Sequence, residues 1–504
     1  MRILLAALLA LVAGCRPATQ LPTDTLIFAR GADSQKLDPH DVDDGESMKV
    51  LVNICEGLVR FQAGTTEVEP GLATKWEISP DGLIYTFTLR PGVKFHDGTP
   101  LDAEAAAFSF RRQMDAHHPA HLKEASFQYW SAMFNMVEAV EVVDQMTLRF
   151  RLKEPHAPFL SSLAIPAASL ISPQFLGQRH PVGTGPFRFA EWIPNEKIVL
   201  ATNQDYWDGA PTIERLVFQV VPDNATRLIQ LQTGQVHAMD GLDPNDRPVV
   251  QRDPNLQLLT APGLNVCYLA FNTQKPPLDN PQLRRALAAA IHKPDIIRAV
   301  YRDAAVIAKN PLPPFVPGHN DSISITHEPS TINHFPAPLR LHVITNPRPY
   351  LPNPIRAAEM VKADLEKLGV KIEIVPNEWG AHLTRTQRGE HDLAFLGWVG
   401  DNGDADNFLY VLLDPETAVV GSALNIAFWK HDPYHQLMVQ ARREVDPAKR
   451  AALYRQAQQM IFDECPLVPL AHAQNIVALR ATVAGVLLQP NGDLLFQHAK
   501  HRQP

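Results

Sequence analysis

Alternating apolar and polar residues predict a β-hairpin early in the chain. Residues 73–90 read ATKWEISPDGLIYTFTLR, in which two strand-like runs flank a Pro-Asp-Gly turn. A helix is predicted next, over residues 103–114, because this stretch is rich in helix-forming residues and Asp102 is suited to cap its first turn. Strand pairing and helix therefore occur together in the first third of the chain.

A helix followed by buried strands is predicted between residues 353 and 398. Proline at position 354 suits the first turn of a helix, an apolar stripe follows at helical spacing, and Gly369 is expected to end it. Residues 370–375 then alternate as a strand, and residues 393–398 form a mostly apolar second strand. Two further helices have the same proline start, at Pro281 and Pro447. This order of elements indicates an α/β fold.

Length and charge narrow the class of protein. A chain of 504 residues is too long for one ordinary core, so two or three structural units are expected. Its net charge of -8 argues against a nucleic-acid partner. The 44 prolines are spread along the chain, which indicates many fixed loops and not one disordered linker.

The first residues indicate export. Arg2 precedes an apolar stretch over residues 3–13, which is too short to span a bilayer core of roughly 30 Å. A secretory signal is therefore predicted over residues 1–14. The small residues before Cys15 resemble a bacterial lipobox, which predicts a lipid on Cys15 and a tether over residues 15–24. An ordinary cleaved signal peptide is the alternative.

The other three cysteines are Cys55, Cys267 and Cys465. They are far apart and form no CxxC motif, so we interpret them mainly as buried packing residues. One long-range disulfide between two of them is the alternative.

Recognisable catalytic motifs are missing from the sequence. It has no GxSxG, HExxH or P-loop motif. An HHxxH cluster, residues 117–121, is interpreted as surface histidines. The acidic stretch GDNGDADNF, residues 400–408, fails the spacing of an EF-hand, so calcium is not supported. No metal and no cofactor are expected. A secreted hydrolase that uses Asp401 and Asp404 as an acid–base pair is the alternative from another class of protein.

Several segments, in order, resemble the periplasmic solute-binding proteins of peptide ABC importers (family 5), and in particular their dipeptide-binding members. They are LDPH at 37–40, VEPGLATKWEISPDGLIYTFTLRPGVKFHDG at 68–98, VGTGPF at 182–187, GLNVCYLAFNTQKPPLDNPQLRRALAAAI at 263–291, RPYLPNPIRAAEMVKADLEKLGVKIEIVPNEWG at 348–380 and GEHDLAFLGWVGDNGDADNF at 389–408. Together they span nearly the whole mature chain.

The resemblance implies a two-lobed α/β binding protein, the large peptide-binding class of type II, which closes on its ligand by hinge bending. Lobe I would comprise residues 25–261 and 479–504 and would hold an extra subdomain at about 55–180. Lobe II would comprise residues 262–478.

The same resemblance implies where a peptide binds. In the family's GDNGDPDNF motif an aspartate pairs with the peptide α-amine, and its position here is Asp401. An arginine of an RPYNP motif takes the peptide carboxylate, and its position here is Arg348, although Leu351 departs from that motif. Trp379 and Trp398 are expected to wall side-chain pockets, or else to pack in the core. Gly400 is expected to let the backbone approach the ligand.

The expected function is therefore a monomeric periplasmic receptor, anchored to a membrane by its lipid, that delivers short peptides to an inner-membrane ABC permease and its ATPase. A receptor of the same fold for haem, as a transported ligand, or for antimicrobial peptides is the close alternative. A sensor that docks on a membrane partner is a third.

Overall fold

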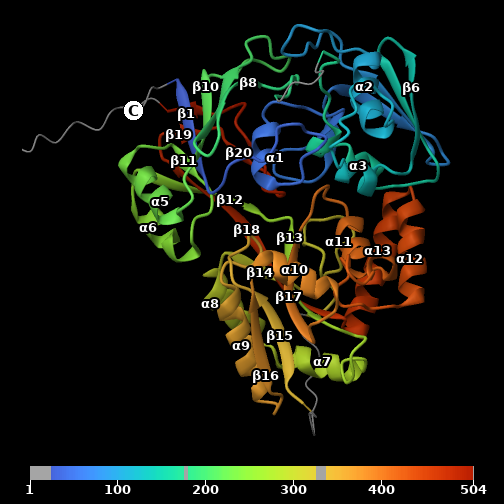
Figure 1. Ribbon diagram of the computed structural model, residues 1–504, viewed down its shortest axis with the longest axis vertical. Helices are drawn as coiled ribbons and strands as arrows, with labels where there is room; N and C mark the ends of the chain where they lie inside the picture. Colours follow the sequence, from blue (N-terminus) through green and yellow to red (C-terminus); the bar gives the residue numbers. More distant parts are fainter. Residues whose placement is uncertain (1–23, 175–179, 325–336, 503–504) are drawn as a thin grey trace, which may run out of the picture.

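One sheet of 12 strands runs through the molecule and joins two lobes, the upper and lower halves of Figure 1. The computed structural model describes residues 24–174, 180–324 and 337–502. The strands of lobe I are β1 (Thr25–Arg30), β8 (Phe187–Ile193), β9 (Lys197–Thr202), β10 (Arg215–Val220), β11 (Ala238–Met239) and β12 (Leu256–Pro262). Those of lobe II are β13 (Asn265–Phe271), β14 (Ala305–Ile307), β15 (Leu339–Ile344), β16 (Ile372–Asn377) and β17 (Leu393–Val399).

The long strand β18 (Leu467–Arg480) belongs to both lobes. Its first half pairs with β13 and its second half with β12, both antiparallel. The strand order is β16-β15-β17-β13-β18-β11-β1-β10-β9-β8, with β12 and β14 also on β18. The chain thus crosses between the lobes twice, at residues 263–264 and in the middle of β18. The lobe boundaries expected at 261/262 and 478/479 stay predictions.

A subdomain of lobe I has its own antiparallel sheet and its own core, formed by buried residues between positions 58 and 170. Its elements are β2 (Val59–Phe61), β3 (Val68–Pro70), β4 (Ala73–Ile78), β5 (Ile84–Leu89), α2 (Ala103–Met114), α3 (Gln128–Met133), β6 (Val137–Asp144), β7 (Thr147–Leu152) and α4 (Phe159–Ser162). The predicted hairpin is confirmed as β4 and β5. The predicted cap is confirmed too, because the Asp102 side chain accepts a hydrogen bond from the Ala105 N–H.

Helices cover both faces of the lobe II sheet. One core cluster is formed with α7 (Pro281–Ala290), α8 (Lys293–Tyr301) and α9 (Pro354–Glu366), and the other with α11 (Asp406–Leu413), α12 (Asp432–Arg443) and α13 (Pro447–Glu464). β13 is buried along its whole length because alternate residues enter the two clusters. This arrangement confirms the α/β class.

The proline starts of α7, α9 and α13 are confirmed, with Asn or Asp capping each helix. β17 is confirmed and extends one residue beyond the prediction, whereas β16 begins at Ile372 and not at Val370, because Gly369 and Val370 complete the turn after α9. The remaining elements are α1 (Gly45–Leu51), η1 (Pro166–Ala168), α5 (Asn224–Thr233), η2 (Pro244–Asp246), α6 (Arg247–Arg252), α10 (Trp379–Gln387), η3 (Pro415–Thr417), β19 (Val483–Ala484), β20 (Leu487–Leu488), β21 (Leu494–Leu495) and β22 (Lys500–His501).

Candidate ligand-binding site

Three neighbouring parallel strands of lobe II deliver the predicted site residues to one edge of the sheet. β15 runs parallel to both β16 and β17. Arg348 follows β15, Trp379 follows β16 and Asp401 follows β17, each within a few residues of the strand's carboxyl end. In open α/β sheets, ligands bind outside this edge. The strand pairing therefore brings these three residues to the same edge.

Asp401 has a buried carboxylate that lacks a cationic partner. Burial raises its pKa, and in the described ranges no Lys, Arg or His lies within 4.0 Å of it. Its Oδ1 accepts a hydrogen bond from the Tyr129 hydroxyl at 3.1 Å, and its Oδ2 accepts one from the Asn407 amide at 3.2 Å. The residue as a whole is half-buried. A buried carboxylate of this kind is suited to a cationic group of a ligand.

Neutral side chains fix the backbone directly beside Asp401. Asn407 Oδ1 accepts hydrogen bonds from the Asp401 N–H at 3.0 Å and from Trp398 Nε1 at 2.9 Å. A Cβ on Gly400 would lie 2.7 Å from the Phe408 ring, so glycine is required here by packing. Trp398 and Gly400 thus shape the loop, and their predicted contact with a ligand stays a prediction.

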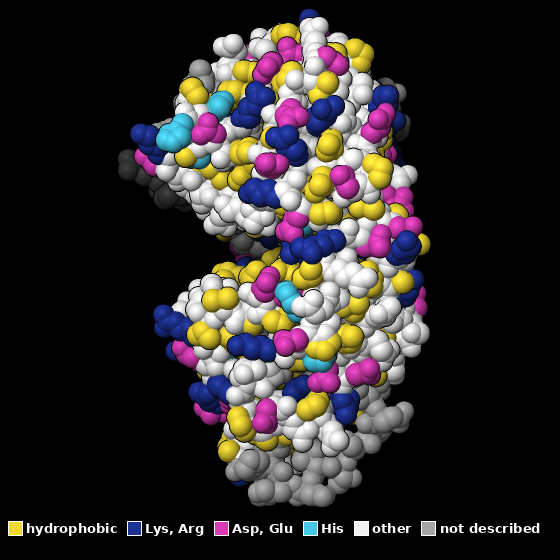
Figure 2. All heavy atoms as spheres, turned by 90° about the vertical axis from the view of Figure 1, so that its right-hand side faces the viewer, with side chains coloured by type: hydrophobic (Ala, Val, Ile, Leu, Met, Phe, Trp, Pro, Cys, Tyr) yellow, Lys and Arg dark blue, Asp and Glu magenta, His cyan; other side chains and the backbone are white. Residues whose placement is uncertain are grey.

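Asp401 lies where the two lobes meet. Tyr129 belongs to α3 of the lobe I subdomain, so its hydrogen bond to Asp401 joins the lobes. Asn402 makes a second such contact by donating to the Ser162 hydroxyl at 3.0 Å. An ion pair of Arg443 with Glu154, at 2.9 Å, is a third. The surface is deeply hollowed between the upper and lower halves of the molecule (Figure 2).

Arg348 is the charged counterpart of Asp401 at this sheet edge. Its guanidinium stacks on the Trp379 ring, with 3.5 Å from Cζ to the ring centroid. Its Nε is buried and has no hydrogen-bond partner, and no carboxylate of the described chain lies within 4.0 Å of it. The backbone of Leu351 exchanges two hydrogen bonds with that of Arg348, at 2.9 and 3.0 Å, so this departure from the family motif sits in an ordered turn.

Tyr350 adds a second buried polar group beside Arg348. Its hydroxyl is buried beside the Arg348 guanidinium, and burial raises its pKa to about 12 although Arg348 favours the ionised form. Gly397 of β17 makes room for the ring, because a Cβ there would lie 2.3 Å from it. Unpaired buried donors are rare in folded proteins, so the free Nε of Arg348 indicates an anion-binding position, with the Tyr350 hydroxyl beside it.

Sequence reasoning did not nominate Tyr129, Tyr350 or Asn407. Tyr350 could have been found, because it stands within the RPY motif that carried Arg348. Asn407 had been interpreted as a turn residue, although it holds Asp401. Tyr129 is 272 positions from Asp401, and nothing in its local sequence indicates that contact.

The other two aspartates of the loop are structural. Asp404 accepts two hydrogen bonds from Arg450, at 2.6 and 2.8 Å, and Arg450 lowers its pKa in spite of burial. Asp406 lies 3.4 Å from Arg442, and burial raises its pKa to about 6. Because both oxygens of Asp404 are engaged by Arg450, this carboxylate is not available as the second member of a catalytic pair.

Arg450→Met is expected to lower the free energy of unfolding by roughly 3 kcal/mol, because it leaves the Asp404 carboxylate buried and unpaired. Urea unfolding followed by circular dichroism would measure this. Arg443→Met is the control: both Arg443 and Glu154 are 57% exposed, and such surface pairs contribute at most about 1 kcal/mol. If the two variants unfolded at the same urea concentration, the structural role of Asp404 would be contradicted.

The remaining candidate features carry no ligand chemistry. His118 packs edge-on against Phe108 and His121 bonds to the Arg112 carbonyl, so these two histidines have separate partners. The cysteines are buried and unpaired, which agrees with packing residues; they are Cys55, Cys267 and Cys465. Cys15 lies outside the described residues. In the described ranges, no helix is long and apolar enough to cross a membrane.

Comparison with known proteins decides the family. Residues 67–418 match the family model "Bacterial extracellular solute-binding proteins, family 5 Middle". The chain belongs to this family. It is 36% identical over 511 residues to the dipeptide-binding protein of Escherichia coli K12, with 95% of each chain covered. It is 38% identical over 469 residues to heme-binding protein A of Haemophilus influenzae, with 86% of this chain and 84% of that protein covered.

Solved structures of this family share the fold. One is the ABC transporter-associated periplasmic binding protein DppA of Helicobacter pylori in complex with the peptide STSA. Its TM-score is 0.79 at 35% identity, and 95% of this chain and 98% of that one are covered. The two-lobed architecture expected from the family-5 motifs is thereby confirmed. As a member of a family of solute-binding proteins, the chain is a transport receptor and not an enzyme, which removes the hydrolase alternative.

Proposed function

We propose that this family-5 receptor captures short peptides, above all dipeptides, between its lobes and delivers them to an inner-membrane ABC permease and its ATPase. One observation carries the proposal: within the described residues the Asp401 carboxylate has no cationic partner and the Arg348 guanidinium has no anionic one, and parallel strands bring both to one sheet edge. A zwitterionic peptide supplies one group for each. The names of the Escherichia coli relative and of the Helicobacter pylori complex support a peptide ligand.

The energetics favour such a ligand. Burying a peptide's charged ends without partners would be very costly. A carboxylate for the ammonium and a guanidinium for the carboxylate each contribute charge-assisted hydrogen bonds, worth about 1.5–3 kcal/mol apiece. The planar guanidinium, fixed on Trp379, suits a carboxylate because it can bind both oxygens. A dissociation constant near 1 μM corresponds to about −8 kcal/mol.

Isothermal titration with a panel of di-, tri- and tetrapeptides tests the proposal. The protein is first unfolded and refolded to remove any bound ligand. Saturable heat with dipeptides at one site per chain is expected. No heat with any di- or tripeptide would overturn the proposal.

Haem is the second candidate, because a relative with 38% identity is named heme-binding protein A. A saturable Soret shift on adding haem, competed by a dipeptide, would place haem in the same cleft. An antimicrobial-peptide receptor would instead show titration heat only with longer cationic peptides.

The proposed cellular setting is the periplasm, with a monomeric chain held to a membrane through a lipid on Cys15. Support comes from the lipobox-like residues before Cys15 and from a family described as extracellular solute-binding proteins.

Peptide affinity is expected to fall at acid pH. Burial holds the pKa of the free Asp401 carboxyl above its usual range, and a bound ammonium would favour the ionised form. Affinity is therefore full above the pKa of the free protein and is lost as pH falls through it. The peptide's own carboxyl titrates lower, at about 3.3–3.7. Titration calorimetry between pH 4 and pH 8 measures this fall. The affinity of Asp401→Asn should not change as the pH falls through this range.

A further inference from the structure

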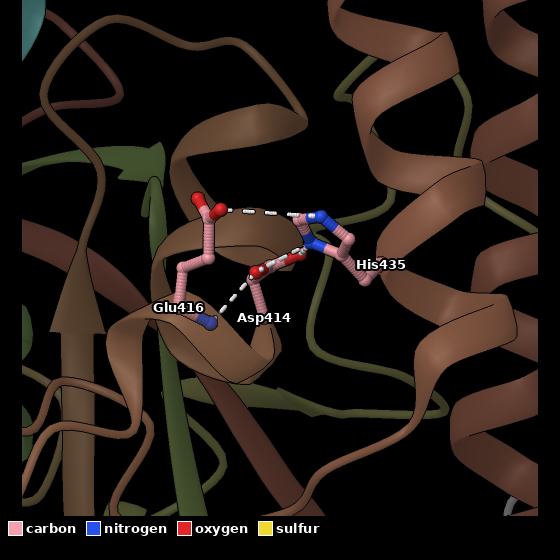
Figure 3. Close-up of side chains that lie close together, drawn as sticks. All are labelled: Asp414, Glu416 and His435. Carbon is pink, nitrogen blue, oxygen red and sulfur yellow. Dashed lines mark hydrogen bonds and ion pairs between the residues drawn. The ribbon is translucent and has the colours of Figure 1, made fainter.

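Two carboxylates and an imidazole converge in lobe II, at the opposite end of α11 from the Asp401 loop. Asp414 and Glu416 lie at the end of α11 and in η3, and His435 projects from α12 (Figure 3). One ligand atom from each lies within 4.8 Å of the others. Asn407, at the other end of α11, is seven residues from Asp414, or roughly 10 Å along the helix axis. The cluster is thus separate from the peptide site.

The spacing of Asp414 and His435 suits two ligands of one metal ion. His435 Nδ1 is 3.0 Å from Asp414 Oδ1, and two ligands bound at about 2.1 Å to one zinc ion lie roughly 3 Å apart. Glu416 faces the other ring nitrogen, with its Oε1 3.9 Å from Nε2, so it has to turn toward the Nδ1 side to join Asp414 on one ion. The Glu416 side chain is 64% exposed, so it can rotate to complete the set, whereas the Asp414 side chain is fully buried and fixed.

The charges around the cluster leave room for a cation. With a neutral imidazole, the form that binds metals, the three ligands carry a net charge of −2. Arg442, which faces the same region, stacks on the Tyr410 ring and lies 3.4 Å from Asp406. The Tyr410 hydroxyl donates to Glu416 and does not neutralise it. A buried carboxylate that no lysine or arginine approaches within 4.0 Å, in the part of the chain described, favours a dication.

Asn425 contacts the backbone of Asp414, and its side-chain oxygen has no hydrogen-bond donor among the described residues. The amide nitrogen of Asn425 donates to the Asp414 carbonyl at 3.2 Å, while the Asn425 side-chain oxygen is buried and accepts no hydrogen bond. Buried acceptors without partners are uncommon. This second observation is independent of the bonds among the three ligands.

We propose that Asp414, Glu416 and His435 bind a divalent transition-metal ion, with zinc as the probe. An imidazole with two carboxylates suits Zn²⁺, Ni²⁺, Co²⁺ or Mn²⁺ better than Ca²⁺ or Mg²⁺, which prefer oxygen ligands alone. Three protein ligands leave a coordination position for water. Such an ion would tie α12 to the end of α11.

The test is zinc titration of the chain purified without an affinity tag and stripped with EDTA. One Zn²⁺ per chain is expected, with affinity at least about tenfold weaker in His435→Gln and in Asp414→Asn. His118→Gln is the matched control, because it changes a histidine of the HHxxH cluster and should leave affinity unchanged. Unaltered zinc affinity in His435→Gln, or no saturable binding by the wild type, would overturn the proposal.

A second measurement keeps the proposal testable if Asp414→Asn fails to fold, since Asp414 also caps η3 by accepting the Glu416 N–H at 2.9 Å. Co²⁺ bound by the wild type should give visible absorption bands that are missing in His435→Gln, and Zn²⁺ should raise the melting temperature of the wild type alone. A purely structural Asp–His pair predicts neither effect.

Discussion

Asp401→Asn is expected to weaken dipeptide binding about a thousandfold, or roughly 4 kcal/mol. The asparagine keeps the size of the side chain and can still meet Tyr129 and Asn407, but it carries no charge. The peptide ammonium would then lose the carboxylate that Tyr129 and Asn407 hold in place for it. Calorimetry with a tight-binding dipeptide measures the loss.

The sharper test compares a free dipeptide with its N-acetyl derivative. Wild-type protein should strongly prefer the free amine, whereas Asp401→Asn should bind the two peptides with similar affinity. Asp321→Asn is the control, because Asp321 is an 84% exposed carboxylate of the same lobe. If Asp401→Asn kept the preference for the free amine, the carboxylate that reads the amine would lie elsewhere.

Local signals predicted the elements that carry the site. The Asn-Pro start of α9 and the apolar run before Gly400 were sufficient to place a helix and a strand, since caps and short apolar runs act within a few residues. The same reasoning misplaced the start of β16 by two residues, because both Val370 and Ile372 are apolar and the turn after Gly369 extends further than its sequence indicates.

The long-range contacts could not be predicted in this way. Three parallel strands place Arg348, Trp379 and Asp401 at one edge, and that pairing depends on tertiary packing. The family motifs nominated the two charges, but the Tyr129 hydroxyl reaches Asp401 from the other lobe. The cluster around His435 was also missed, because its ligands come from a one-turn helix and from α12, 21 positions apart.

The contact between Tyr129 and Asp401 bears on how the lobes close. The hydroxyl already occupies one oxygen of the carboxylate, with the lobes in contact at Asn402 and Arg443 as well. Among the described residues, the second oxygen accepts a hydrogen bond from the Asn407 amide alone, at the long distance of 3.2 Å. A peptide ammonium can therefore join this carboxylate without displacing Tyr129, and closure and amine binding would reinforce each other.

Arg348→Met should also weaken dipeptide binding about a thousandfold, because the peptide carboxylate would lose its cationic partner in a buried position. Methionine keeps an apolar chain against Trp379, so the loop should remain folded. The affinity of Arg348→Lys should lie between those of the wild type and Arg348→Met, about tenfold weaker than the wild type. An ammonium cannot bind both carboxylate oxygens or stack flat on the indole.

Peptide amides distinguish a lost charge from a damaged loop. Wild-type protein should bind a dipeptide amide far more weakly than the free acid, and Arg348→Met should bind the two alike, so the effects of variant and amide do not add. Arg356→Met, which alters a 55% exposed arginine of α9, should match the wild type. If the affinity losses of the variant and of the amide add, Arg348 acts through the shape of its loop. Another group, such as the neighbouring Tyr350, would then bind the peptide carboxylate.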